Sequence, residues 1–217
     1  AYYNSSFAYL KKGLIEDAIN MLKKGIELNP DRGLLYFLLG NAYSDKGLSD
    51  DAIIAWEKAI EKNPKHYKAY NNLGFAYYSK GLAEKAIASL KEAIEIKDNY
   101  AEAHYHLGSI YIEKEMPKEA VLELTRTIAL KPDHTKAHYN LGLIYRHLGD
   151  MDNAIAEWKM AVKLDPTYSK AYNNLGVAYD FINKIDEAIY QYKHAIEMKS
   201  DYGEAHYNLG IAYAKKG

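Results

Sequence analysis

Apolar residues stand three or four positions apart along the whole chain, which is the spacing of one face of an α-helix. In one stretch, Leu73, Ala76 and Tyr77 form a first group, and Ala86 and Leu90 form a second group. Polar residues and a glycine separate the two groups. The pattern therefore predicts two consecutive amphipathic helices in this stretch and similar pairs in the rest of the chain.

The pattern returns with a constant period of 34 residues. One column holds only tyrosine: Tyr9, Tyr43, Tyr77, Tyr111, Tyr145, Tyr179 and Tyr213. A second column holds small residues: Ser6, Gly40, Gly74, Gly108, Gly142, Gly176 and Gly210. A third column, in the second helix, holds bulky residues: Leu22, Trp56, Leu90, Leu124, Trp158 and Tyr192. We expect the small residues to let the two backbones approach closely while the bulky side chains fill the space beside them.

The break between the two helices falls on glycine in most repeats: Gly13, Gly47, Gly81, Gly149 and Gly217. Glycine accepts the left-handed conformation of a helix C-cap at the least cost. Asn183 can take this role less well, and Glu115 cannot do so easily. Pro117, which follows shortly after Glu115, suits the first position of the next helix. The third full repeat therefore has the most unusual turn of the chain.

A single helix pair cannot bury its apolar face, so the pairs must stack into an all-α solenoid. We expect one array over residues 1–217, divided as follows: 1–32 lacking its first two positions, 33–66, 67–100, 101–134, 135–168, 169–202, and a lone first helix at 203–217. This last helix keeps the buried columns without a second helix to cover them. The array is thus expected to continue beyond Gly217 in a longer chain, the alternative being a natural end that frays.

One unit shows the complete pattern of a known family: Tyr70, Leu73-Gly74, Tyr77, Gly81, Ala86, Leu90 and Ala93. This pattern resembles the tetratricopeptide repeat (TPR), and the resemblance covers the whole chain. The unit departs from it at Asp98, where the family has proline. The pentatricopeptide repeat, which reads RNA, has a period one residue longer, so the fixed period of 34 favours the protein-binding family. The resemblance implies a right-handed α-solenoid of stacked antiparallel helix pairs.

The resemblance also implies that the first helices line the concave wall of the superhelix, where a partner segment lies. One column of that wall is mostly asparagine: Asn4, Leu38, Asn72, His106, Asn140, Asn174 and Asn208. Asparagine is a mediocre helix former, but its amide has both donors and an acceptor for the backbone of an extended peptide. The alternative is that these asparagines bridge neighbouring repeats through solvent.

The residues expected to line this groove include amides, aromatic rings and cations: Asn41, Lys68, Asn72, Phe75, Tyr105, His106, Lys136, Tyr139, Asn140, Arg146, Lys170, Asn174, Tyr207 and Asn208. Exposed rings supply large contact area at little entropic cost, and the alternative is that some of them fill gaps between first helices. The cations suit a partner with scattered acidic residues, unless they are simply solvated. The carboxylate clamp of chaperone-binding relatives is not expected, because its first cation and its arginine are missing.

The composition of the chain argues against several classes of function. The formal net charge of -1 gives no general attraction to nucleic acid, and no apolar run approaches the length of a membrane span. The absence of cysteine excludes disulfides and thiolate chemistry. No targeting segment is visible, so the compartment stays open, with the cytoplasm favoured.

Histidine offers the clearest candidate for metal chemistry, because His134 and His138 have the i, i+4 spacing of two zinc ligands on one helix. However, His104, His138 and His206 share a column with tyrosines in other repeats, which indicates packing. No nucleophile elbow, phosphate loop or dinucleotide fingerprint is present. We therefore expect no metal, no cofactor and no active site.

The sequence thus predicts a non-catalytic scaffold that binds an extended partner segment. Asn140 and Asn174 would hold its backbone, and Tyr105 and Tyr139 would anchor its side chains. One alternative is the substrate-recruiting region of a larger multidomain enzyme. Another is head-to-tail self-association through the uncovered terminal repeats.

Overall fold

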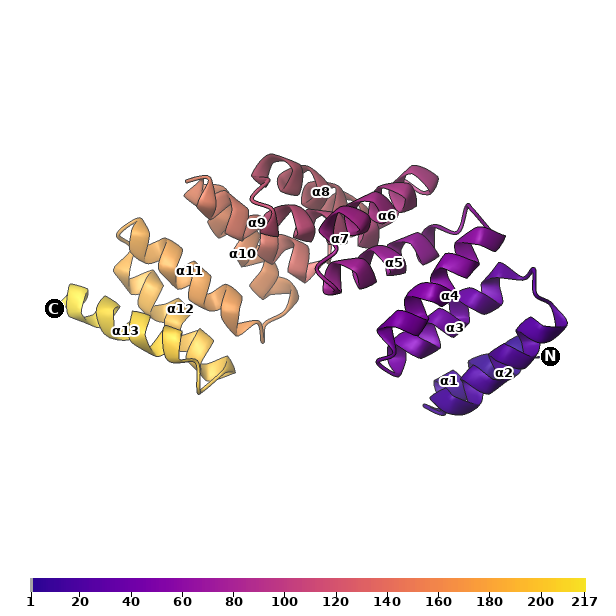
Figure 1. Ribbon diagram of the computed structural model, residues 1–217. Helices are drawn as coiled ribbons and strands as arrows, with labels where there is room; N and C mark the ends of the chain where they lie inside the picture. Colours follow the sequence, from indigo (N-terminus) through magenta and orange to yellow (C-terminus); the bar gives the residue numbers. More distant parts are fainter. Residues whose placement is uncertain (1) are drawn as a thin grey trace. The chain divides into compact units, whose positions relative to one another are not determined.

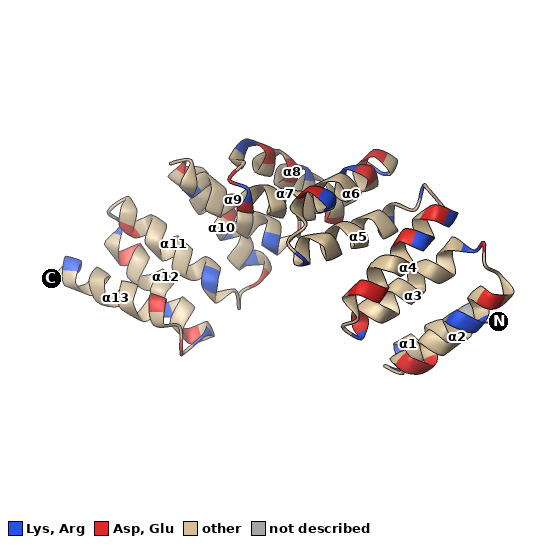
Figure 2. Ribbon diagram, in the orientation of Figure 1, with Lys and Arg blue, Asp and Glu red and all other residues tan. Residues whose placement is uncertain are grey.

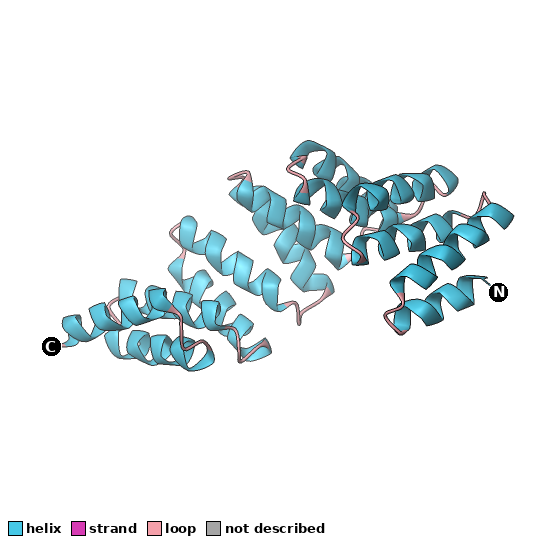
Figure 3. Ribbon diagram, turned by 60° about the horizontal axis from the view of Figure 1, so that its bottom comes forward, coloured by secondary structure: helices cyan, strands magenta, loops and turns pink. Residues whose placement is uncertain are grey.

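The computed structural model describes the backbone of residues 2–217 and the side chains from residue 5 onward. Over this range the chain forms thirteen α-helices and no strand (Figures 1 and 3), which confirms the all-α class. The first helices of the pairs are α1 (Tyr2–Lys11), α3 (Gly33–Asp45), α5 (Tyr67–Ser79), α7 (Ala101–Glu113), α9 (Thr135–His147), α11 (Ser169–Phe181) and α13 (Gly203–Lys216). The second helices are α2 (Ile15–Leu28), α4 (Ser49–Lys62), α6 (Ala83–Ile96), α8 (Pro117–Leu130), α10 (Met151–Leu164) and α12 (Ile185–Met198).

The helices fall into two compact units, residues 1–107 and 108–217, and the division of the chain into the repeats given above stays a prediction. The boundary lies inside α7. Within unit 1, α1 packs on α2, α3 on α4 and α5 on α6, and each pair contacts the next. Within unit 2, α9 pairs with α10 and α11 with α12, and α13 packs on α12 (Figure 1). Each unit is therefore a stack of helix hairpins.

The closest approach inside a pair is between a glycine of the first helix and a bulky side chain of the second. A methyl group added to Gly142 would lie 2.4 Å from Nε1 of Trp158, and one added to Gly74 would lie 2.7 Å from Cγ of Leu90. The side chains of Trp158 and Leu90 are fully buried. The bulky side chain therefore packs directly against the glycine, closer than the expected position beside it. Any Cβ on the glycine would force the two helices apart.

The turns between paired helices share one backbone arrangement, whatever residue occupies them. Gly81 has φ +74°, and the N–H of Leu82 donates to the carbonyl of Tyr77 at 2.9 Å. Glu115 adopts the same left-handed conformation with φ +54°, and Met116 N–H donates to the carbonyl of Tyr111, also at 2.9 Å. A left-handed non-glycine residue costs about 1–2 kcal/mol. The third repeat therefore keeps the common turn at a local energetic cost.

Within the described residues, helix α13 differs from the other first helices because no second helix packs over its glycine column. A methyl group added to Gly210 would meet nothing within 4 Å. Tyr213 is 46 % exposed, whereas Tyr179, one repeat earlier, is 8 % exposed. The glycine and tyrosine columns are thus present in α13 without the packing that they make elsewhere.

This contrast allows a matched test of the close approach. We expect Gly142→Ala to lower the stability of unit 2 by about 1–3 kcal/mol, because the added methyl overlaps the Trp158 ring. Gly210→Ala should leave stability unchanged or raise it by up to about 1 kcal/mol, since alanine is the better helix former. Urea denaturation of both variants measures the difference. Equal losses in the two variants would show that the glycine column does not act through the second helix.

Candidate functional site

The first helices expose an almost uncharged surface. Lys68 is the only charged residue of α5, whereas charged residues occur along the whole of α4. Figure 2 shows the same contrast between α9 and its neighbouring second helices, with blue and red concentrated on the second helices and near the turns. A partner that contacts the first helices would therefore meet mainly amides, aromatic rings and aliphatic side chains.

Three asparagines of α3 and α5 form a hydrogen-bonded cluster in unit 1. The side chain of Asn72 donates to Oδ1 of Asn41 at 2.9 Å, and Trp56 Nε1 donates to the same oxygen at 3.0 Å. Asn71 donates to Oδ1 of Asn72 at 3.3 Å. Asn72 thus bridges neighbouring first helices directly, as the alternative interpretation of the asparagine column expects, but without solvent.

The asparagine cluster lines a hollow of about 370 Å³ in unit 1. The residues around it are Asn41, Ser44, Asp45, Trp56, Asn71, Asn72, Phe75 and His106. Asn71 is only 5 % exposed, and its Oδ1 has no hydrogen-bond partner in the described part of the chain. A buried acceptor without a partner costs about 1–3 kcal/mol, so the cluster holds this oxygen at a local energetic cost.

An aromatic group stands beside this hollow. The Phe75 ring lies 5.0 Å from the His106 ring, centre to centre, and the Tyr105 ring lies 5.6 Å from that of His106. Phe75 is 50 % exposed, although it is held by this contact. The structure therefore brings together Asn41, Asn72, Phe75, Tyr105 and His106 among the expected groove residues.

In unit 2 the asparagines of this column mainly form hydrogen bonds with other side chains of the same unit. Asn174 is 8 % exposed, donates to the Tyr139 hydroxyl at 3.1 Å and accepts from Arg146 at 3.4 Å. Asn208 donates to Asn173 at 3.1 Å, linking α13 to α11. Asn174, expected from the sequence to hold a peptide backbone, is therefore occupied in joining α9 to α11.

The remaining expected residues are accessible. Asn140 is half-buried and makes no side-chain hydrogen bond within the described residues. Tyr207 is exposed on α13. Lys68 on α5, Lys136 on α9 and Lys170 on α11 are exposed and form no ion pair with any described residue. Asn4 lies outside the residues whose side chains are described.

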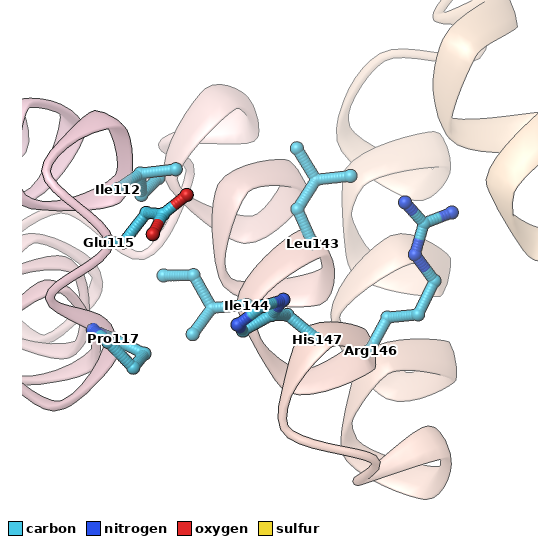
Figure 4. Close-up of a pocket in the computed structure, with 7 residues that line it drawn as sticks. All are labelled: Ile112, Glu115, Pro117, Leu143, Ile144, Arg146 and His147. Atoms are coloured by element: carbon cyan, nitrogen blue, oxygen red, sulfur yellow. The ribbon is translucent and has the colours of Figure 1, made fainter.

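A second hollow, of about 330 Å³, lies in unit 2 between the α7–α8 turn and α9 (Figure 4). Its walls are formed by Ile112, Glu115, Pro117, Leu143, Ile144, Arg146 and His147. Arg146 is expected from its sequence position to lie in the groove, but the sequence does not predict this hollow. Two residues of the hollow differ from their counterparts in other repeats: Glu115 replaces a turn glycine, and Ile144 stands where other repeats have Ala42 and Ala178.

The histidines with zinc-like spacing have other partners. His138 is buried, and its two ring nitrogens lie 2.6 Å from Glu157 Oε2 and 3.0 Å from the carbonyl of Pro132. Both neighbours are acceptors, so the doubly protonated ring fits the site and Glu157 raises the pKa of His138. His134 Nδ1 accepts a hydrogen bond from the backbone of Ala137 at the start of α9. Among the described residues, no three potential metal ligands gather at one point.

None of the described helices combines the length and the apolar character that crossing a membrane requires.

Comparison with known proteins identifies the repeat. Family models described as TPR repeat and tetratricopeptide repeat match most of the chain: residues 8–47, 76–115, 142–180 and 182–217 for the first, and 33–66, 55–88 and 101–134 for three others. A search of curated proteins found no match.

Solved structures with this fold are numerous. YrrB, described as a TPR protein with an unusual peptide-binding site, is 25 % identical with a TM-score of 0.74, covering 90 % of this chain and 98 % of YrrB. MamA is 33 % identical with a TM-score of 0.69, covering 75 % of this chain and 95 % of MamA. PilF of Pseudomonas aeruginosa, at 15 % identity, has a TM-score of 0.86 over 97 % of this chain and 96 % of its own, and shows the fold alone.

Two asparagines of the same column should behave differently when truncated. Asn174→Ala removes the hydrogen-bond partner of the half-buried Tyr139 hydroxyl and of the exposed Arg146, so we expect stability to fall by about 0.5–1.5 kcal/mol. Asn140→Ala removes no internal hydrogen bond and should change stability by less than about 0.5 kcal/mol. Denaturant midpoints of the two variants provide the comparison. A similar small effect in both would mean that the Asn174 contacts contribute nothing.

The ion pair of His138 predicts a pH dependence. Its pKa is raised in the folded state, so its stabilisation is fully present below the unfolded value of about 6.5 and is lost as pH rises through the folded value. Tyrosine occupies the same column in Tyr70 and Tyr172, so His138→Tyr fits the site without the charge. Wild type should exceed His138→Tyr in stability by more at about pH 5.5 than at about pH 8.5. A difference independent of pH would contradict the ion pair.

Proposed function

The chain belongs to the tetratricopeptide repeat family, whose repeats form protein-interaction scaffolds, and we propose that its first helices bind an extended segment of a partner protein. The hollow in unit 1 is the main contact in this proposal. Within unit 1, the exposed Lys68 of α5 adds a cation to the contact surface.

The observation that carries this proposal is the hydrogen-bonded asparagine cluster at the hollow. Hydrogen bonds among Asn71, Asn72 and Asn41 hold the amides in place. The half-buried amides of Asn41 and Asn72 line the hollow and carry the donors and acceptors that a partner would meet. Backbone N–H and C=O groups of an extended segment are hydrogen-bonding groups that every partner sequence offers.

The exposed Phe75 ring supports the same proposal. Interface energy is concentrated in a few aromatic or arginine anchors surrounded by weaker contacts. Phe75 is positioned by His106 and lies next to the asparagine cluster, so one ring and one set of amides face the same hollow. An aliphatic or aromatic partner side chain packed on Phe75 would bring its own backbone close to the amides.

The comparison with YrrB adds support, since that protein is described as having a peptide-binding site and spans most of this chain. The proposal differs from the sequence expectation in its residues. Asn71, Asn72 and Phe75 replace the pair Asn140 and Asn174 as the main contacts, because Asn174 is buried between α9 and α11.

The test is a peptide-display selection against the complete chain, followed by affinity measurement for an enriched peptide. We expect Phe75→Ala to weaken binding by about tenfold or more, with a circular dichroism spectrum and denaturation midpoint close to wild type. Leu122→Ala is the matched control, because it removes an exposed apolar side chain from a second helix.

Equal losses in Phe75→Ala and Leu122→Ala would contradict a site on the first helices. Failure to enrich any extended motif would contradict segment binding altogether. A molecular mass that rises with concentration in the absence of peptide would instead favour self-association through the terminal helices.

A further inference from the structure

The hollow in unit 2 has two apolar walls that belong to different helix pairs. Ile112 and Pro117 come from the α7–α8 side, and Leu143 and Ile144 come from α9 (Figure 4). Its volume of about 330 Å³ lies at the lower end of the roughly 300–1,000 Å³ of small-molecule sites. A space of this size and character suits one large apolar side chain.

The α9 wall carries a larger side chain than most first helices have at this position. The position of Ile144 is alanine in five other first helices, at Ala8, Ala42, Ala76, Ala178 and Ala212, and isoleucine at Ile110 in α7. Ile144 is buried and lines the hollow. The combination of Ile144 with Glu115 in the facing turn occurs in this repeat alone among the described residues.

Glu115 gives the hollow a charge. Its carboxylate is exposed, forms no ion pair with any described residue, and is turned toward the α9 wall (Figure 4). The backbone of Glu115 is left-handed, in a turn position that the chain fills with glycine at Gly13, Gly47, Gly81 and Gly149. Asn183 adopts the same conformation with φ +59°, so the turn imposes it, and the feature particular to this repeat is the carboxylate.

The cation on the opposite wall, Arg146, already contacts other residues of the chain. Arg146 contributes its aliphatic stem to the hollow, while its guanidinium donates to Asn174 at 3.4 Å and lies 5.9 Å from the Trp158 ring. Figure 4 shows this guanidinium directed away from Glu115. The free carboxylate at the rim of an apolar hollow is thus complementary to a basic group.

From these observations we propose that the hollow between the α7–α8 turn and α9 binds a partner segment that inserts one large apolar side chain and places an adjacent lysine or arginine against Glu115. The site lies entirely in unit 2 and shares no residue with the hollow that carries the proposed function. It can therefore be tested separately from that function.

The experiment uses the complete chain with labelled isoleucine and leucine methyl groups, observed by NMR. The probes are the blocked dipeptides acetyl-Trp-Arg-amide and acetyl-Trp-Glu-amide. We expect saturable shifts of the Ile112, Leu143 and Ile144 methyls, with the arginine probe binding about three- to fivefold more tightly, as an exposed ion pair allows. Phe75→Ala should leave these shifts unchanged.

Three variants isolate the role of Glu115. Glu115→Gln should abolish the preference for the arginine probe, and Glu119→Gln, which removes the same charge from α8 outside the hollow, should preserve it. Glu115→Gly should raise the denaturation midpoint, because glycine relieves the left-handed strain, and should also abolish the preference.

The proposal is overturned if no methyl at the hollow responds to either probe, or if both probes bind equally to the wild-type chain. It is also overturned if Glu119→Gln removes the preference as effectively as Glu115→Gln. Shifts confined to the isoleucine and leucine methyls of unit 1 would place probe binding outside this hollow and would equally contradict the proposal.

Discussion

The contact between a glycine of the first helix and a bulky side chain of the second helix, made in the five pairs from α3–α4 to α11–α12, is the constraint on which the fold depends. At Gly142 the Trp158 indole occupies the place where any Cβ would stand, and at Gly176 the Tyr192 ring does the same. This contact sets the distance between the paired backbones. The opposite side of the first helix does not pack against the second helix of its pair. The amides and rings of Asn72 and Phe75 can therefore vary without disturbing the pair.

The turn geometry follows from the same close pairing. Two antiparallel helices in contact need a short reversal, and a left-handed residue followed by a hydrogen bond to the tyrosine carbonyl provides it in every pair. Glu115 shows that this geometry is imposed by the pair and not by the turn residue, because a glutamate adopts it too. At Glu115, tertiary packing overrides the preference of a non-glycine residue for negative φ.

Most of the fold follows from the sequence, because period, glycine column and turn residues all specify the same hairpin. The candidate sites follow less completely. The asparagine column is visible in the sequence, but no pattern distinguishes Asn140, which makes no internal hydrogen bond, from Asn174, which is buried beside Tyr139 and Arg146. The partnerless oxygen of Asn71 depends on angles between α3 and α5 that spacing does not encode. Glu115 and Ile144 were visible as departures from their columns, and the hollow between them was not.

The separation of charge between first and second helices has a consequence for how the protein responds to ionic strength. Ion pairs such as Lys46 with Glu16 and Lys80 with Asp50 join neighbouring repeats at exposed positions, where added salt screens them. The glycine contacts and the asparagine cluster act at short range between uncharged groups, and salt hardly affects them. Concentrated salt would thus loosen the outer connections between repeats while leaving the surface of the first helices intact.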